Sequence, residues 1–227
     1  MFFRHEGLPA RLGEYIIGRK KRKNRNRGAV RKVKRLLITG FEPFDGESVN
    51  PSWEAVRRLP DRVGAWELTR LRVPTVFGLA GEKALEAAEA LRPDAVLCVG
   101  QAGGRAGVTP EAVAVNLREA AIPDNAGNRP VNEPVKAGGP AAYFATVPVR
   151  EMVRAIREAD IPASLSLSAG AFVCNDLLYT LLEHFDGSET RVGFIHVPFL
   201  PEQAGNGQPA LPLEKITLAL QRAIEVL

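Results

Sequence analysis

The chain has 227 residues, 45% of them hydrophobic and 25% charged, which suits one globular α/β domain with a proper core. It contains no internal repeat and no apolar run of transmembrane length, and its two cysteines, Cys98 and Cys174, are too few for a disulfide framework or a cysteine-based metal site. Since the N-terminus also lacks the apolar segment of a signal peptide, we expect a reduced, cytoplasmic protein.

The net charge of +4 is distributed unevenly along the chain. Residues 1–35 contain 13 Lys/Arg and 2 Asp/Glu, so the remainder carries an excess of acidic groups. The stretch GRKKRKNRNRGAVRKVKR has few apolar residues, which predicts a disordered basic extension over 1–34 and a folded domain over 35–227. Such an arm could bind nucleic acid or another anionic surface, but charge runs specify little, and we favour an unstructured leader.

The first half of the folded domain alternates strand and helix patterns. Apolar or alternating runs predict strands, and amphipathic stretches bounded by Asn, Gly or Pro predict helices. Asn50 is the expected cap of the first helix, with Pro51 in its first turn. In chain order we expect a strand over 35–40, a helix over 51–59, a strand over 66–74, a helix over 81–93, a strand over 94–100 and a strand over 111–117.

The second half continues the alternation after a Gly/Pro/Asn-rich connection. The connection covers 122–140. Beyond it we expect a helix over 149–159, a strand over 163–168, a helix over 175–184, a strand over 191–199 and a helix over 212–226. This order predicts the α/β class, with a mainly parallel sheet covered by helices on both faces. Ligands of such sheets bind at the carboxyl ends of the strands.

The two cysteines occupy different settings. Cys98 lies within the apolar strand AVLCVG, where a free cysteine is usually a small core residue. Cys174 follows SAGAFV and begins a helix. A helix N-terminus favours negative charge, which lowers the pKa of a thiol, and its N–H groups can bind an oxyanion. The residues alone leave a nucleophile and a buried structural cysteine equally open at Cys174.

Of the three histidines, His196 is the best candidate to partner a cysteine nucleophile. His5 lies in the basic extension, and His184 ends a helix, where its charge suits the helix dipole. His196 ends an apolar strand in FIHVPF, and we expect this strand end to lie beside the one that presents Cys174. An acidic group should orient the ring, and spacing does not decide among three candidates: Glu111, Asp124 and Asp176.

Six ordered motifs resemble those of pyroglutamyl peptidase type I, or pyrrolidone-carboxylate peptidase, a family of cysteine peptidases. They are LLITGFEPFDGESVNPS, CVGQAGGR, TPEAVAVN, IPDNAGNRPV, SAGAFVCNDLLYTLL and GFIHVPFLPEQ. The resemblance runs from about Arg35 to the C-terminus. It implies an α/β/α sandwich, often assembled as a homotetramer, that removes pyroglutamate from peptide N-termini without metal or cofactor. The triad of the family falls on Cys174, His196 and Glu111.

The resemblance also implies a pocket for the pyroglutamyl ring. It assigns the apolar faces to Phe41 and Phe44, the polar contacts to Asn50 and Gln101, and a further contact to Val173, beside the cysteine. Pyroglutamate is a flat, neutral lactam without a free amine, so the pocket must recognise the ring amide. A site built on such paired hydrogen bonds should reject proline, which lacks the ring carbonyl.

Three positions depart from the family pattern. Ala112 and Ala121 stand where arginine is usual, and Phe172 stands where tyrosine is frequent. Arg105 and Arg118 are candidates to replace the missing charge at 121. These departures leave the triad intact and bear on the catalytic rate. They motivate one alternative, a weakened homologue that binds peptides or partners.

Two further alternatives come from other classes of protein. A nucleic-acid-associated protein would depend on residues 1–35 and bind more weakly as salt rises. A nucleoside-processing enzyme on a similar α/β scaffold is disfavoured, because its chemistry does not need a Cys–His–Glu set.

Overall fold

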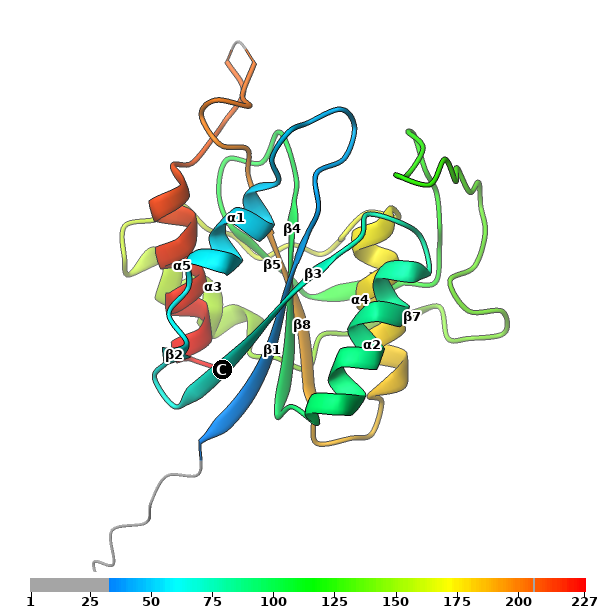
Figure 1. The fold of residues 1–227 in the computed structure, drawn as a ribbon, viewed down its shortest axis with the longest axis horizontal. Coiled ribbons are helices and arrows are strands. Elements are labelled where there is room, and N and C mark those ends of the chain that lie inside the picture. Colours follow the sequence, from blue (N-terminus) through cyan, green and yellow to red (C-terminus); the bar gives the residue numbers. More distant parts are fainter. Residues whose placement is uncertain (1–32, 206) are drawn as a thin grey trace, which may run out of the picture. The chain divides into compact units, whose positions relative to one another are not determined.

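The computed structural model describes residues 33–205 and 207–227, so the predicted basic extension, apart from Val33 and Lys34, lies outside the described residues. Six strands form one sheet in the order β2-β3-β1-β4-β8-β5 (Figure 1). Strands β3, β1, β4 and β8 are parallel, and the two edge strands are antiparallel to their neighbours. The mainly parallel sheet predicted from the sequence is therefore confirmed. The strand bounds are β1 Lys34–Phe41, β2 Arg62–Val63, β3 Trp66–Val73, β4 Ala95–Gln101, β5 Thr109–Glu111 and β8 Arg191–Val197.

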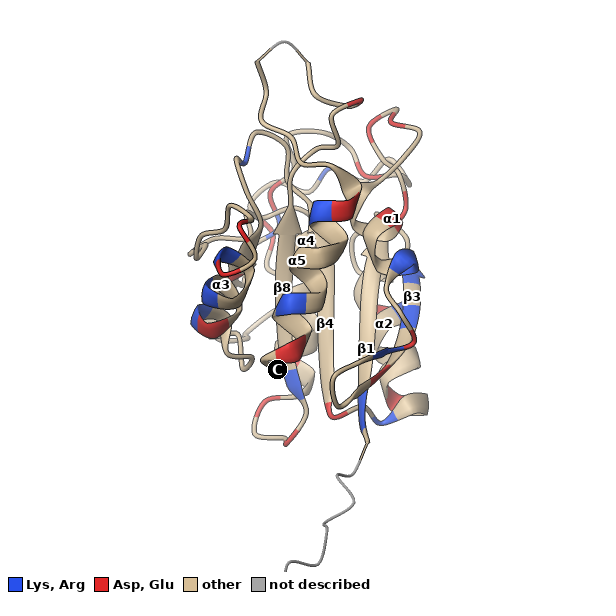
Figure 2. Cartoon of the chain, turned by 90° about the vertical axis from the view of Figure 1, so that its left-hand side faces the viewer, with Lys and Arg blue, Asp and Glu red and all other residues tan. Residues whose placement is uncertain are grey.

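Helices cover both faces of this sheet (Figures 1 and 2). One face carries α1 (Pro51–Arg58), α3 (Val149–Arg157) and α5 (Leu213–Glu225). The other carries α2 (Leu79–Leu91) and α4 (Val173–His184). Two cores result, and adjacent residues of β1 alternate between them because successive side chains of a strand point to opposite faces. Burial on both faces explains why the central strands are almost continuously apolar.

The start of α1 is tied to the end of β1. The Asn50 side chain accepts the N–H of Ser52 at 3.0 Å, as expected of the predicted cap, and donates to the carbonyl of Glu42 at 3.1 Å. A Cβ at Gly40 would lie 2.7 Å from the backbone Cα of Trp53, so glycine there lets α1 pack closely against β1. These contacts place Asn50 at the carboxyl edge of the sheet.

Two of the predicted strands were wrong in their extent or existence. The segment 111–117 is not one strand, because β5 ends at Glu111 and β6 (Val113–Val115) pairs with β7 (Ala142–Phe144) in a separate two-stranded sheet. The chain changes partner at Ala112. The segment 163–168 forms only isolated bridges beside β5, although its residues alternate as a strand would.

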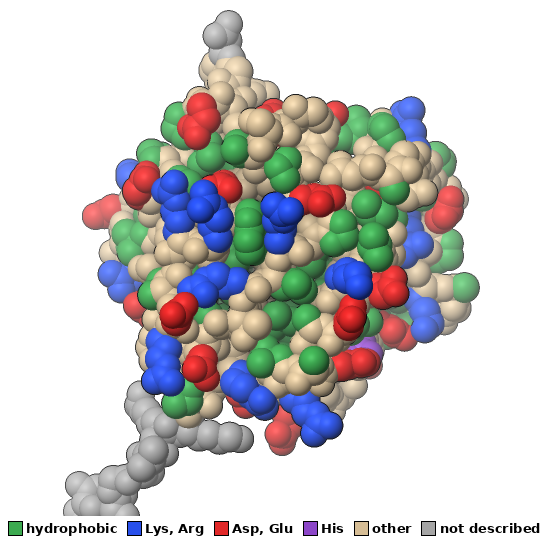
Figure 3. Space-filling model, viewed as in Figure 1, with side chains coloured by type: hydrophobic (Ala, Val, Ile, Leu, Met, Phe, Trp, Pro, Cys, Tyr) green, Lys and Arg blue, Asp and Glu red, His purple; other side chains and the backbone are tan. Residues whose placement is uncertain are grey.

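The helices were predicted more closely. Helices α2 and α4 begin two residues earlier than the periodicity indicates, and the earlier start of α4 places Cys174 inside its first turn. No helix in the described part of the chain is long and apolar enough to cross a membrane. On the face shown in Figure 3, Lys and Arg side chains lie interspersed with Asp and Glu.

Candidate active site

A cavity of about 280 Å³ lies at the carboxyl ends of β1, β4 and β8, where an open α/β sheet binds its ligands. Its lining includes six of the residues singled out in the sequence: Phe41, Phe44, Asn50, Gln101, Cys174 and His196. Segments more than 150 residues apart in the sequence therefore meet at one wall. The remaining lining residues are Thr75, Ala102, Arg105, Ser168, Ala169, Gly170 and Phe172.

The Cys174 sulfur lies over the end of β4. Cys174 is the second residue of α4, and a Cβ built on Gly100 would lie only 2.8 Å from its Sγ. Gly100 is paired with His196 across β4 and β8. The missing side chain at Gly100 thus makes room for the thiol beside the strand that carries the imidazole. Among the described residues, the His196 ring has its hydrogen bond with Glu111 and none with the Cys174 thiol, as is common for a catalytic pair without bound substrate.

Glu111 orients the His196 ring. Its Oε1 lies 2.7 Å from His196 Nδ1, and both side chains are buried. Glu111 reaches this position because β5 runs antiparallel to β8, with Thr109 opposite His196. The ionised carboxylate accepts a hydrogen bond from Nδ1–H, and this leaves Nε2 of the neutral ring unprotonated and able to act as a base. The histidine tautomer needed for general-base catalysis follows from this one contact.

The two rival acids serve the scaffold instead. Asp124 accepts backbone N–H groups of Phe77, Ala126 and Asn128. Asp176 accepts the Gly78 N–H at 2.7 Å and Arg118 Nε at 2.6 Å. Neither carboxylate contacts His196, so of the three acids left open by spacing only Glu111 meets the ring.

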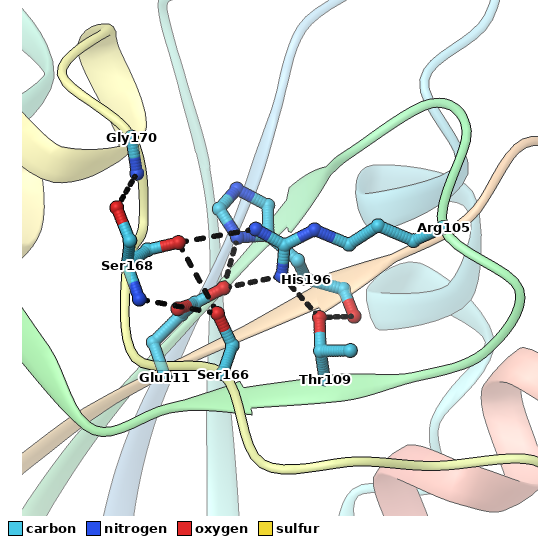
Figure 4. A network of polar contacts seen from close by, with 7 residues as sticks. All are labelled: Arg105, Thr109, Glu111, Ser166, Ser168, Gly170 and His196. Atoms are coloured by element: carbon cyan, nitrogen blue, oxygen red, sulfur yellow. Dashed lines mark hydrogen bonds and ion pairs between the residues drawn. The ribbon is translucent and has the colours of Figure 1, made fainter.

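Arg105, by contrast with Arg118, belongs to the site. Its Nη1 donates to Glu111 Oε1 at 2.6 Å and to the Thr109 hydroxyl, and its Nη2 donates to the carbonyl of Ser168 at 3.2 Å. Figure 4 shows its guanidinium lying across Glu111 and next to His196. The sequence signal was the glycine-rich stretch QAGGR at the end of β4, which presents a side chain at a strand end.

Burial is the largest cause of the pKa shifts of Cys174 and His196. It raises the pKa of the Cys174 thiol well above its usual range, and the Glu111 charge adds to this effect, whereas Arg105 opposes it. Burial likewise lowers the pKa of His196, although Glu111 acts in the opposite direction. Both pKa shifts favour the neutral thiol and the neutral imidazole in the free protein. Desolvation thus acts against the lowering of the thiol pKa that is expected at a helix start. The space around the sulfur is small, since a Cβ on Gly100 would lie within 3 Å of both Cys174 Sγ and the Phe194 ring.

Glu111 itself stays ionised. Burial would raise its pKa, but the hydrogen bond and charge of His196, together with the charge of Arg105, lower it below its usual range. The ring therefore faces a carboxylate that can stabilise an imidazolium when one forms. Cys98 is fully buried, and desolvation raises its pKa to about 12, as suits the core role predicted for it.

The aromatic wall of the cavity extends beyond the predicted residues. Phe172 packs against Phe44 at 6.1 Å between ring centroids and edge-to-face against Phe77 at 5.2 Å. Sequence reasoning singled out Phe172 only as a departure from the family pattern. Val173 is fully buried in the core and does not line the cavity, so the structure provides no side-chain contact to support its predicted role.

Two of the three positions that depart from the family pattern, Ala112 and Ala121, lie off the cavity, whereas Phe172 lines it. Ala112 links β5 to β6, with its N–H bonded to the Ser166 carbonyl and its own carbonyl to the Ala145 N–H. Ala121 is exposed in the connection after Leu117. In the described part of the chain, no group of three His, Cys, Asp or Glu residues could hold a metal ion.

Comparison with known proteins points to one family. The sequence profile of the family described as pyroglutamyl peptidase matches residues 34–227. A pyrrolidone-carboxylate peptidase of Erwinia tasmaniensis is 51% identical over 197 residues, which cover 86% of this chain and 92% of that protein. One from Bacillus cereus is 46% identical over 86% of this chain and 93% of its own length. The crystal structure of pyroglutamyl peptidase I from Bacillus amyloliquefaciens superposes with a TM-score of 0.82 at 48% identity, covering 85% of this chain and 96% of that one.

Proposed function

This chain belongs to the pyroglutamyl peptidase family and is a cysteine-type peptidase, and on that premise we propose that Cys174, His196 and Glu111 hydrolyse the bond after an N-terminal pyroglutamyl residue. The observation that best supports this proposal is the 2.7 Å contact between Glu111 Oε1 and His196 Nδ1, since His196 and Cys174 line the same cavity. The alternative of a non-catalytic homologue receives no support from these relatives, which are peptidases by name.

The proposed reaction begins with a neutral thiol and a neutral imidazole. His196 Nε2 takes the Cys174 proton as Sγ attacks the carbonyl carbon of the scissile amide, and Glu111 stabilises the imidazolium. The free N–H groups at the start of α4, that of Cys174 among them, are placed to bind the oxyanion. The tetrahedral intermediate collapses as the imidazolium protonates the leaving amine, which leaves a pyroglutamyl thioester on Cys174.

The second half of the reaction releases pyroglutamate. Water enters the site of the departed amine, and His196 Nε2 takes its proton as the oxygen attacks the thioester carbonyl. Collapse of this second intermediate breaks the carbon–sulfur bond and returns the proton to Sγ. The products are free pyroglutamate and the shortened peptide. Every proton moves through His196, so the chemistry needs no metal or cofactor.

The cavity lining suits a neutral lactam. Phe41 and Phe44 provide apolar surface for the flat ring, and Gln101 offers a side-chain amide to its lactam group. Asn50 has its amide oxygen committed to Ser52 and one N–H to Glu42, so its second N–H is the group that it can donate to the lactam. None of the described lining residues is an aspartate or glutamate. A substrate with a free N-terminal ammonium would therefore find no carboxylate to pair with, and would lose its hydration without compensation.

Release of a fluorescent amine from a pyroglutamyl amide tests this function. We expect thiol-dependent release from the pyroglutamyl amide and none from the matched prolyl amide, which lacks the ring carbonyl. The Cys174→Ala variant is the control for release by a contaminating peptidase. Equal turnover of both amides would refute the assigned specificity, and no release from a folded, reduced sample would refute the activity.

We also propose that residues 35–227 form the peptidase domain, that it works in the cytoplasm, and that it assembles as a homotetramer. The family match from residue 34 onward supports the boundary. Removal of residues 1–32 should leave kcat/KM unchanged, whereas loss of activity would assign the basic extension to the enzyme. Sedimentation of the full chain measures the assembly directly.

A further inference from the structure

We propose that Arg105 is a positioning residue of this peptidase, which limits how strongly Glu111 binds the His196 ring and holds the segment before Cys174 against β5. The inference rests on the proposed triad. It concerns a residue that does not need to touch the substrate, because it acts through Glu111.

The first argument is that one carboxylate oxygen of Glu111 contacts both Arg105 and His196. Glu111 Oε1 accepts from Arg105 Nη1 at 2.6 Å and from His196 Nδ1 at 2.7 Å. The other oxygen, Oε2, is buried and has no hydrogen-bond partner among the described residues. The guanidinium and the ring therefore share the negative charge of one oxygen, each through its own hydrogen bond. A carboxylate shared in this way stabilises an imidazolium less than a carboxylate committed to the ring alone.

The second argument is that Arg105 joins two separate segments of the wall. Its Nη1 also donates to the Thr109 hydroxyl on β5, and its Nη2 donates to the Ser168 carbonyl, in the segment that leads into α4. Ser168 and Gly170 line the cavity as well. The planar fork of a guanidinium can make these contacts together, whereas a lysine ammonium is a point charge on a flexible stem. Arg105 therefore ties the segment that precedes Cys174 to β5, and Figure 4 shows its contacts with Glu111, Thr109 and Ser168.

The third argument concerns charge. His196 is faced by Glu111 from β5, by Arg105 from the loop after β4, and by Cys174 from α4. Buried Cys98 of β4 acts only on Cys174, whose pKa it raises. Among these groups Arg105 is the only permanent cation, and it lowers the pKa of both the His196 ring and the Cys174 thiol. Glu111 acts in the opposite direction on both.

The same geometry separates Arg105 from the other arginine considered for this role. Arg118 is paired with Asp176, and among the described residues that line the cavity Arg105 is the one Lys or Arg. Ala121, where the family pattern has arginine, is exposed and off the cavity. The cationic contribution to the described site therefore comes from Arg105.

The pH dependence of kcat/KM distinguishes this role from simple structural support. In Arg105→Gln the charge is lost at similar side-chain length, so the pKa of His196 and that of Cys174 should both rise. We expect the acidic limb of the kcat/KM profile to move upward by roughly 0.5–1 pH unit. The pH profile for the rate of Cys174 alkylation by iodoacetamide should move in the same direction by a similar amount. Arg105→Lys keeps the charge but loses the fork, so kcat should fall while the acidic limb stays within about 0.2 pH unit of the wild type.

The matched control is Arg58→Gln, which removes an exposed arginine paired with Glu214 on the surface. Its kcat/KM, and the pH dependence of both kcat/KM and Cys174 alkylation, should equal those of the wild type. If Arg105→Gln lowers the rate but moves neither limb of its pH profiles, the proposal is overturned and Arg105 has a purely structural role. Unchanged kinetics of Arg105→Gln would also overturn the proposal. If Arg105→Gln does not fold, a shifted acidic limb in Arg105→Lys would overturn it. No turnover by the wild type would refute the proposed function instead, and the alkylation limb would still test Arg105.

Discussion

Replacing Gly100 with alanine should inactivate this peptidase through its nucleophile. Gly100 does not have a positive φ, so alanine causes no backbone strain there and acts only through the space that its Cβ fills. That Cβ would lie 2.8 Å from Cys174 Sγ and 2.7 Å from Cζ of Phe194. The sulfur is held on the first turn of α4 and cannot retreat into the buried helix.

The expected loss can be worked from these distances. Non-bonded heavy atoms prefer separations of about 3.5–4.0 Å, so the thiol and the ring together must give way by roughly 1 Å. A misplacement of about 1 Å at a reacting group costs on the order of 100-fold in rate. Overpacking of this kind also destabilises the fold by about 1–3 kcal/mol, which corresponds to a fall in Tm of roughly 2–12 °C for a domain of this size.

The assay is kcat/KM on the pyroglutamyl amide, measured at a temperature where thermal melting shows the variant to be folded. Gly205→Ala is the matched control, since the nearest atom to its Cβ is the flexible side-chain oxygen of Gln208 at 3.5 Å. It should retain wild-type rate and Tm. A Gly100→Ala variant with kcat/KM within about threefold of the wild type would refute the placement of the sulfur over β4.

The remaining predictions concern the catalytic groups themselves. Cys174→Ala and His196→Ala should abolish turnover with Tm preserved, and Glu111→Gln should reduce kcat by about 10²–10⁴-fold; near-normal kinetics of any one would remove its assigned role. A thiol alkylator should inactivate the enzyme at Cys174 rather than at buried Cys98, and peptide mass mapping would expose a wrong assignment. Because the pKa of His196 is lowered, the base should stay neutral below its usual pKa of about 6.5, so the acidic limb of kcat/KM lies below that pH; a limb above 7 would contradict the burial argument.

Local residue patterns were sufficient for most elements of the fold. The Asn50–Pro51 cap and the periodicity of the helices depend on neighbours within one turn, and the structure confirms them. The errors came where the chain changes partner. Residues 111–117 alternate throughout, but the switch from β8 to β7 occurs at Ala112, and no local pattern encodes which strand lies alongside.

Sequence reasoning likewise identified some residues of the candidate site and left another undecided. The chemistry of rare residue types pointed to Cys174 and His196, because few other nucleophiles and bases stood at element ends. Spacing left Glu111 equal to Asp124 and Asp176, and family resemblance was needed to prefer it. The structure separates them by contact, since only Glu111 reaches the imidazole.

The sequence by itself determined the fold class, the family and the residues able to do the chemistry, because each of these is written in periodicity, motif order and residue type. Only the tertiary structure decided which acid meets His196, that Arg105 shares the oxygen of that acid, and that burial raises the pKa of the Cys174 thiol. Those properties depend on distances between segments far apart in the chain and on how much water remains around each group. Packing sets both quantities, and no short stretch of residues contains them.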